Sequence, residues 1–155
     1  MVYVRPYRPS DLDDVIEVFV RSVREGAARD YAPAQIDAWA QVNRDVWSVK
    51  RSRHPTWVAM IGASLVGFAD LESDGHLDMM FVHPSYQGAG VASALLVQVE
   101  ASAHERGIAR IHTEASITAR PFFERRGFQV HAQQEVSVRG ERLTNFRMEK
   151  TFAPR

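Results

Sequence analysis

The sequence predicts a mixed α/β domain in which helices cross between strands. Segments with helical spacing alternate with short β-rich runs along the chain. A turn of small residues at 88–90 leads directly into a long amphipathic segment, and two β-rich runs around Arg139-Gly140 predict a closing hairpin. Because no repeat, low-complexity tract or linker interrupts the 155 residues, we expect one domain that spans 1–155.

The first third of the chain predicts one strand and three helices. Residues 2–7 alternate β-formers up to Pro6, which indicates a strand. Ser10 is a suitable N-cap for a helix that runs to about Gly26, with acidic residues in its first turn and apolar residues at helical spacing. Shorter helices are expected over 33–40 and 44–51.

The remaining elements alternate between strands and helices. Residues 56–61 and 65–71 predict a hairpin around Gly62, and 76–83 predicts a strand that ends before Pro84. The amphipathic segment predicts a helix from roughly Gly90 to Arg106, capped by Gly107. The elements expected after it are a strand at 108–114, a helix at 118–126, and a hairpin of 128–138 with 142–150.

Composition excludes several classes of protein. Hydrophobic residues make up 45% and charged residues 25%, which is typical of a globular protein. The 19 basic and 19 acidic residues balance, so no net charge draws the chain to nucleic acid or to an anionic membrane. The chain has no cysteine, hence no disulfide, thiolate metal site or cysteine nucleophile. Without a signal peptide or membrane-spanning window, we expect a cytoplasmic protein, and we predict no metal.

The turn at Gly88, Ala89 and Gly90 has three interpretations. The glycines could simply permit a tight strand-to-helix turn. A dinucleotide-binding fingerprint fails because Ser93 stands where a third Gly or Ala belongs, and a P-loop fails because no Lys follows the glycines. The remaining interpretation is that backbone N–H groups at a helix start, with small side chains around them, bind a diphosphate.

The pattern Gln87-x-x-Gly90-x-Ala92 resembles the pyrophosphate-binding motif of the GNAT superfamily of acyl-CoA N-acyltransferases. Three other stretches are similar to the family in the same order: VRPYRPSDLDDVIEVF, TWVAMIGASLVGFADL and ARPFFERRGF. The resemblance implies a mostly antiparallel sheet of about six or seven strands flanked by about four or five helices. It further implies acetyl-CoA as acyl donor, an amine acceptor that attacks directly, and compatibility with a homodimer.

The resemblance also implies the cofactor site. The diphosphate would lie on Gln87, Gly88, Ala89, Gly90, Val91 and Ala92. Phe81 and Val82 would offer backbone groups to the pantetheine arm, and an N–H near Met80 or Phe81 would polarise the thioester carbonyl. The resemblance places Ser116, Phe122 and Phe123 beside the cofactor. For the phosphorylated adenosine end, a cation could come from Arg120, Arg125 or Arg126, between which the sequence does not decide.

The amine must lose a proton, and Asp78 is the first candidate base. An Asp in an apolar strand costs stability unless it faces a cleft or is paired, and several family members carry a catalytic Glu in this strand. With an ordinary Asp pKa of about 3.9, the residue needs burial or a water relay to act on an ammonium. Glu114 is the second candidate and Glu72 the third, while His83 and His112 titrate nearer neutrality.

The acceptor side is predicted in the stretch from Asp30 to Trp47. Tyr31 and Trp39 could form an aromatic wall for the acceptor, and Asp30 and Asp37 could attract a cationic amine. The alternative is that these aromatic residues fill the edge of the core.

Two departures from the family pattern bear on activity. Ser116 stands where the family usually has Asn, and Phe123 where it usually has the Tyr that protonates the leaving thiolate. Because Phe cannot donate a proton, the alternative to an enzyme is a catalytically silent acyl-CoA-binding regulatory domain. A plain interaction domain is a third reading, which the complete Gln-x-x-Gly-x-Ala pattern disfavours.

Overall fold

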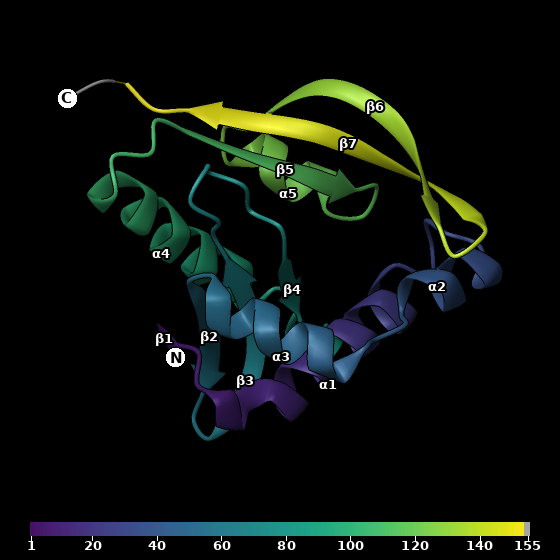
Figure 1. Ribbon diagram of the computed structural model, residues 1–155, viewed down its shortest axis with the longest axis horizontal. Helices are drawn as coiled ribbons and strands as arrows, with labels where there is room; N and C mark the ends of the chain where they lie inside the picture. Colours follow the sequence, from purple (N-terminus) through teal and green to yellow (C-terminus); the bar gives the residue numbers. More distant parts are fainter. Residues whose placement is uncertain (154–155) are drawn as a thin grey trace.

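A four-stranded and a three-stranded antiparallel sheet organise the chain, of which the computed structural model describes residues 1–153 (Figure 1). The first sheet has the order β1 (Val2–Pro6), β2 (Thr56–Ile61), β3 (Ser64–Asp70) and β4 (Met80–Val82). The second has the order β5 (Arg110–Ser116), β7 (Glu141–Thr151) and β6 (Gln129–Val138). The predicted mixed α/β fold class is therefore confirmed.

The helices follow the predicted order. They are α1 (Leu12–Arg21), α2 (Pro33–Trp39), α3 (Arg44–Arg53), α4 (Val91–Glu105) and α5 (Arg120–Arg125). A π-helical turn, Ser22–Gly26, extends α1, and Pro9–Asp11 and Pro84–Tyr86 form 3-10 turns. The predicted N-cap Ser10 is wrong, because it lies within the first 3-10 turn and Asp11 precedes α1. Among residues 1–153, no helix has the length and apolar character needed to cross a membrane.

The first sheet is covered on both faces, as the alternation along β2 shows. Trp57 and Ala59 pack into a core cluster with α4, whereas Val58 and Met60 pack into a second cluster with α1 and α3. Gly67 on β3 permits the close packing of α4 on the sheet, since a Cβ on Gly67 would lie only 2.8 Å from Val91 Cγ1. The start of α4 is thereby held against the sheet.

The two sheets meet at one point and then separate. His76 and His112 form an isolated parallel bridge, in which Leu77 N donates to His112 O over 2.9 Å. The predicted strand 76–83 is wrong in its first half, because only Met80–Val82 are strand. The amides of Asp78 and Met79 both donate to the Asp70 carboxylate over 2.9 Å and so leave the ladder. β4 and β5 therefore diverge beyond this point.

A buried ion pair between α3 and the end of β3 holds this region in place. Arg51 of α3 and Asp70 are 1% and 0% exposed, and Arg51 Nη2 lies 2.9 Å from Asp70 Oδ2. Burial raises the pKa of Asp70, and the Arg51 guanidinium and the amide of Met79 oppose that rise. Because removing either partner would leave an uncompensated buried charge, the pair locks α3 to the segment that leads into β4.

Candidate active site

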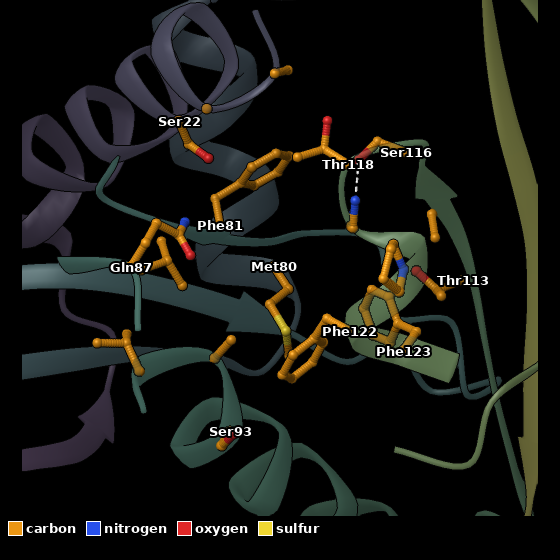
Figure 2. A pocket seen from close by; sticks show the side chains of 18 of the residues that line it. Ser22, Met80, Phe81, Gln87, Ser93, Thr113, Ser116, Thr118, Phe122 and Phe123 are labelled. Atoms are coloured by element: carbon orange, nitrogen blue, oxygen red, sulfur yellow. Dashed lines mark hydrogen bonds between the residues drawn. The ribbon is translucent and has the colours of Figure 1, made fainter. Parts of the chain in front are cut away.

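A cavity of about 690 Å³ lies where β4 and β5 separate. Figure 2 shows Gln87 to the left of Phe81 and Met80, Ser93 below them, and Thr113, Ser116, Phe122 and Phe123 to their right. The lining contains residues from the π-helical turn after α1 and from α2, β4, the turn before α4, α4, β5 and α5. The cavity therefore collects side chains from both sheets.

The glycine turn forms one end of the cavity. Gly88 and Gly90 have φ of 80° and 81°, in the left-handed region that favours glycine. A Cβ on either glycine would meet nothing within 4 Å, so the backbone is open to an approaching group. Gly90 caps α4 without a side chain, which leaves the first amides of the helix without a protein acceptor. This end is suited to an anion.

Most of the predicted diphosphate-binding residues line the cavity. Gln87, Gly88, Gly90, Val91 and Ala92 belong to the lining. The exposed Ala89 does not, and its amide donates to Tyr86 O over 3.3 Å.

Two of the three candidate cations lie at this end. Arg125 and Arg126 line the cavity, and Arg126 donates to Ser93 Oγ and covers the ring of Phe122 at 4.9 Å. Arg120 lies outside the lining, pairs with Glu124 and covers Phe146. The structure therefore favours Arg125 and Arg126 over Arg120 as partners of a phosphate.

The free edge of β4 borders the middle of the cavity. Met79 O accepts from Asp70 N over 3.0 Å, and His83 N donates to Val66 O over 2.8 Å, so odd-numbered residues direct their backbone groups toward β3. Because strand backbone groups alternate, those of Met80 and Val82 point to the open edge. The free amide is therefore that of Met80 rather than that of Phe81, and Met80 and Val82 are the residues of β4 whose backbone groups remain open.

The side chains that depart from the family pattern also border this region. Phe123 is buried, packs against Phe122 and Phe128 at ring distances of 5.4 and 5.1 Å, and lines the cavity. Ser116 Oγ accepts from Ala119 N over 3.0 Å, a bond drawn in Figure 2. Among the described lining residues, Tyr86 is the only phenol.

Two carboxylates lie at the opposite end. Asp78 and Glu114 both line the cavity, and they and His76 bring ligand atoms within 4.8 Å of one another. Each carboxylate has a cationic partner on its far side: Lys50 of α3 donates to Asp78 Oδ2, and His76 Nε2 lies 2.7 Å from Glu114 Oε1. The hydrogen bond to Glu114 raises the pKa of His76 to about 9. His76 is therefore an imidazolium at neutral pH.

This cluster has the residue types of a metal site, although its groups already have other partners. Within residues 1–153, His76, Asp78 and Glu114 are the one group whose spacing would suit a metal ion. A metal would need a neutral His76 and would have to displace the Lys50 ammonium from Asp78. The arrangement therefore favours a network of ion pairs over a metal centre.

The predicted acceptor residues separate into two groups. Trp39 lines the cavity, whereas Tyr31 is buried behind it. The Tyr31 hydroxyl donates to Thr144 O over 2.6 Å and accepts from Ile117 N over 2.9 Å, and burial raises its pKa. Direct contact of Tyr31 with an acceptor is not favoured, because its hydroxyl joins β7 to the loop after β5.

The predicted acidic residues of this stretch are also engaged elsewhere. Asp37 pairs with Arg24 over 2.6 Å, and Asp30 accepts from Thr118 Oγ1 over 2.7 Å. Neither lines the cavity. Among the described residues, the carboxylates that line the cavity are therefore Asp78 and Glu114.

His76 and Lys50 were not identified from the sequence. The remaining candidates for the proton transfer, Glu72, His83 and His112, lie outside the cavity lining. Glu72 contacts His76, and His83 Nε2 lies 2.8 Å from Arg21 Nη1. His112 stacks on His76 with ring centroids 5.0 Å apart. No local pattern indicates that His76 or Lys50 belongs to the site, since the lining carboxylates that they contact are 38 and 28 residues away.

Comparisons with known proteins agree with this geometry. A family model described as an acetyltransferase (GNAT) domain matches residues 27–150. An uncharacterized N-acetyltransferase of Escherichia coli K12, YafP, is 43% identical over 147 residues, which cover 95% of this chain and 94% of YafP.

Solved structures extend the similarity. A GCN5-related N-acetyltransferase from Rhodopseudomonas palustris is 34% identical, with a TM-score of 0.94 over 97% of this chain and 95% of that one. The PaiA N-acetyltransferase of Thermoplasma acidophilum, solved in complex with coenzyme A, is 20% identical, with a TM-score of 0.81 over 98% and 99% of the two chains. At that identity the second likeness concerns the fold alone.

Proposed function

The chain belongs to the GNAT family of acetyltransferases, and on this premise we propose that it transfers the acetyl group of acetyl-CoA directly to a cationic amine. The observation that carries the proposal is the polarity of the cavity. One end has unpartnered helix amides and two arginines, and the other has a pair of carboxylates. The free edge of β4 lies between them.

Acetyl-CoA fits the glycine-turn end. Its diphosphate would accept from the first amides of α4, because no side chain caps this helix start. Arg125 and Arg126 would pair with the phosphate of the adenosine end. The pantetheine arm would extend along β4, where Met80 and Val82 offer backbone groups, and the thioester would reach the middle of the cavity.

The carboxylate pair fits the proton transfer. An amine arrives as an ammonium with an ordinary pKa of about 10.4, so one N–H bond must break before attack. Asp78 or Glu114 takes up this proton, and the nitrogen lone pair then attacks the thioester carbon. The Met80 amide stabilises the oxyanion, a contact that contributes about 3 kcal/mol in comparable sites.

The leaving group does not require the missing family tyrosine. A thiol has an ordinary pKa of about 8.5, so the thiolate leaves without complete protonation. The second proton of the amine nitrogen, or the Tyr86 phenol, supplies the proton of the free thiol. Phe123 packs beside this position and excludes water from the thioester.

The charges of the lining also indicate the acceptor class. Among the described residues, the lining carboxylates are Asp78 and Glu114, and the lining arginines lie at the cofactor end. An acceptor with a carboxylate or phosphate beside its amine would face these two carboxylates directly, because their cationic partners Lys50 and His76 lie outside the lining. We therefore propose an amine without a neighbouring acidic group, with its apolar part against Trp39 and Phe81.

The test is release of free thiol from acetyl-CoA over pairs of amines that differ by one carboxylate. Tyramine is compared with tyrosine, and cadaverine with lysine. We expect at least about tenfold higher kcat/KM for the amine in each pair, which corresponds to about 1.4 kcal/mol. Binding of acetyl-CoA in a thermal-shift assay without turnover of any amine would instead identify a silent acyl-CoA-binding domain.

A further inference from the structure

His76 connects two carboxylates that come from different parts of the fold. Its Nδ1 lies 2.5 Å from Glu72 Oε1, and its Nε2 lies 2.7 Å from Glu114 Oε1. A carboxylate can only accept, so both ring nitrogens donate and the ring is an imidazolium. The bond to Glu114 joins the segment before β4 to β5 at the point where these strands separate.

The backbone at His76 is held without help from its ring. His112 N donates to Gly75 O over 3.0 Å, and Leu77 N donates to His112 O over 2.9 Å. The backbone of Gly75 packs closely against that of Arg110, because a Cβ on Gly75 would lie 2.2 Å from Arg110 O. These backbone hydrogen bonds hold the turn without the His76 ring. We therefore look for a role of the ring in its two contacts with carboxylates.

We propose that His76 is a positioning residue that holds one oxygen of Glu114 and leaves the other free to face the bound amine. The inference rests on the proposed function, because it assigns His76 a role in the same proton transfer. In that step an N–H bond of the ammonium breaks and an O–H bond forms on the carboxylate pair. His76 keeps both of its protons throughout, and the carboxylate later releases its proton to solvent.

The surrounding charges support this assignment. Carboxylates outnumber cations around the ring, and the His76 side chain is only 19% exposed, so its neighbours favour the protonated ring. The hydrogen bond to Glu114 is the main reason that the pKa of His76 rises to about 9. The titratable groups that face His76 or its direct partners are His54, Lys50, Glu72, Asp74, Asp78, His112 and Glu114.

The first experiment follows the histidine rings by NMR in the cofactor-free protein. The signal of His76 is identified by its absence in His76→Gln. We expect it to titrate near pH 9 in the wild type, and to move toward its ordinary value of about 6.5 in Glu114→Gln. A His76 pKa that is unchanged in Glu114→Gln would show that the two groups are not coupled and would overturn the proposal.

The second experiment measures kcat/KM for the amine against pH. In His76→Gln the carboxylate pair loses a neighbouring positive charge, so its acidic limb should move upward by about one pH unit. His112→Gln is the control, because it removes the stacked ring but keeps the Glu114 contact; its limb should not move. A uniform loss of rate in His76→Gln with an unmoved limb would mean that His76 only supports the fold.

The two proposals fail in different ways. If the proposed function is wrong, the wild type turns over no amine, while the NMR titration still decides whether His76 and Glu114 are coupled. If the positioning role is wrong, the wild type is active and either the limb or the titration fails to respond. Should His76→Gln not fold, Glu114→Gln reports the coupling from the other partner.

Discussion

The two ends of the cavity are built in different ways. The cofactor end consists mainly of backbone: two glycines with positive φ and the uncapped start of α4, all within residues 87–93. The amine end consists of side chains from α3, the segment before β4, and β5. The first is a continuous piece of chain, whereas the second exists only after both sheets have assembled.

This difference predicts how each end responds to change. A backbone site tolerates most side-chain substitutions and fails when the backbone conformation or the open space is lost. A site of coupled charges depends on every partner and on pH. The predictions below test this contrast, beginning with the largest effect.

Removing either carboxylate of the pair should affect turnover most. We expect Asp78→Asn and Glu114→Gln each to lower kcat by roughly 10²- to 10⁴-fold, the range for loss of a general base. Affinity for acetyl-CoA should stay about the same, because both residues lie at the amine end. Steady-state kinetics and calorimetry measure the two effects. Glu124→Gln, which alters an exposed carboxylate paired with Arg120, is the matched control. A pH–rate profile identical to that of the wild type would assign the altered carboxylate a structural role.

Stability should depend on pH through the amine end. The pKa of His76 rises from 6.5 to about 9 on folding, so its stabilisation is complete below about pH 6.5 and is lost as pH rises through 9. The difference corresponds to at most about 3 kcal/mol. Urea denaturation at several pH values measures it. In His76→Gln the decline between these pH values should be smaller, and equal declines in both proteins would contradict the coupling.

The cofactor end should fail through its backbone. Gly90→Val should weaken acetyl-CoA binding by about 10- to 100-fold, comparable to losing a hydrogen bond to a charged group. Gly107→Val is the control, because Gly107 has a φ of 69° and equally open surroundings at the other end of α4. Both variants should lose stability from a strained φ, by at least about 1–2 kcal/mol. Calorimetry would contradict the assignment if a folded Gly90→Val protein bound acetyl-CoA as well as Gly107→Val.

Trp39 tests whether the acceptor touches the aromatic wall. Trp39→Ala should raise KM for the amine by roughly 3- to 10-fold and leave KM for acetyl-CoA unchanged, because an aromatic contact is lost. Trp47→Ala is the comparison: Trp47 is buried against Phe19 at 4.9 Å and does not line the cavity. That variant should lower the melting temperature with little change in either KM. Equal effects of Trp39→Ala on both KM values would make Trp39 a packing residue.

Phe123 should produce the smallest change. Because a thiolate leaves readily, Phe123→Tyr should alter kcat by less than about tenfold. The added hydroxyl also has to fit a position that is only 4% exposed, between Phe122 and Phe128. Thiol release with the best amine of the panel measures the effect. If the wild type is inert and Phe123→Tyr becomes active, the silent-binding alternative is correct.

Much of the fold was predictable because it depends on local signals. Periodicity placed α1 to α5 and the terminal hairpin within a few residues, since an element buries the face that its own sequence makes apolar. The glycine turn was equally predictable, because positive φ and an uncapped helix start depend only on neighbouring residues. The extent of the domain, 1–155, stays a prediction.

The predictions that were wrong, and the site residues that were missed, involve contacts between residues far apart in the chain. The strand expected at 76–83 is interrupted because the Asp70 carboxylate captures two amides that would otherwise pair with a neighbouring strand. Tyr31 is buried outside the cavity lining because its hydroxyl forms hydrogen bonds with Thr144 O and Ile117 N. Such contacts compete with local preference, and local preference does not reveal which contact prevails.

The sequence by itself determined the class of the fold and the glycine turn that opens α4, because short-range geometry specifies both. Only the tertiary structure decided that Met80 rather than Phe81 presents the free amide, since the edge of β4 is free only where β5 diverges. It likewise decided the partners of Asp78 and Glu114. A pKa and a charge pair depend on distances across the fold, and those distances are set when the two sheets meet at His76 and His112 and then part.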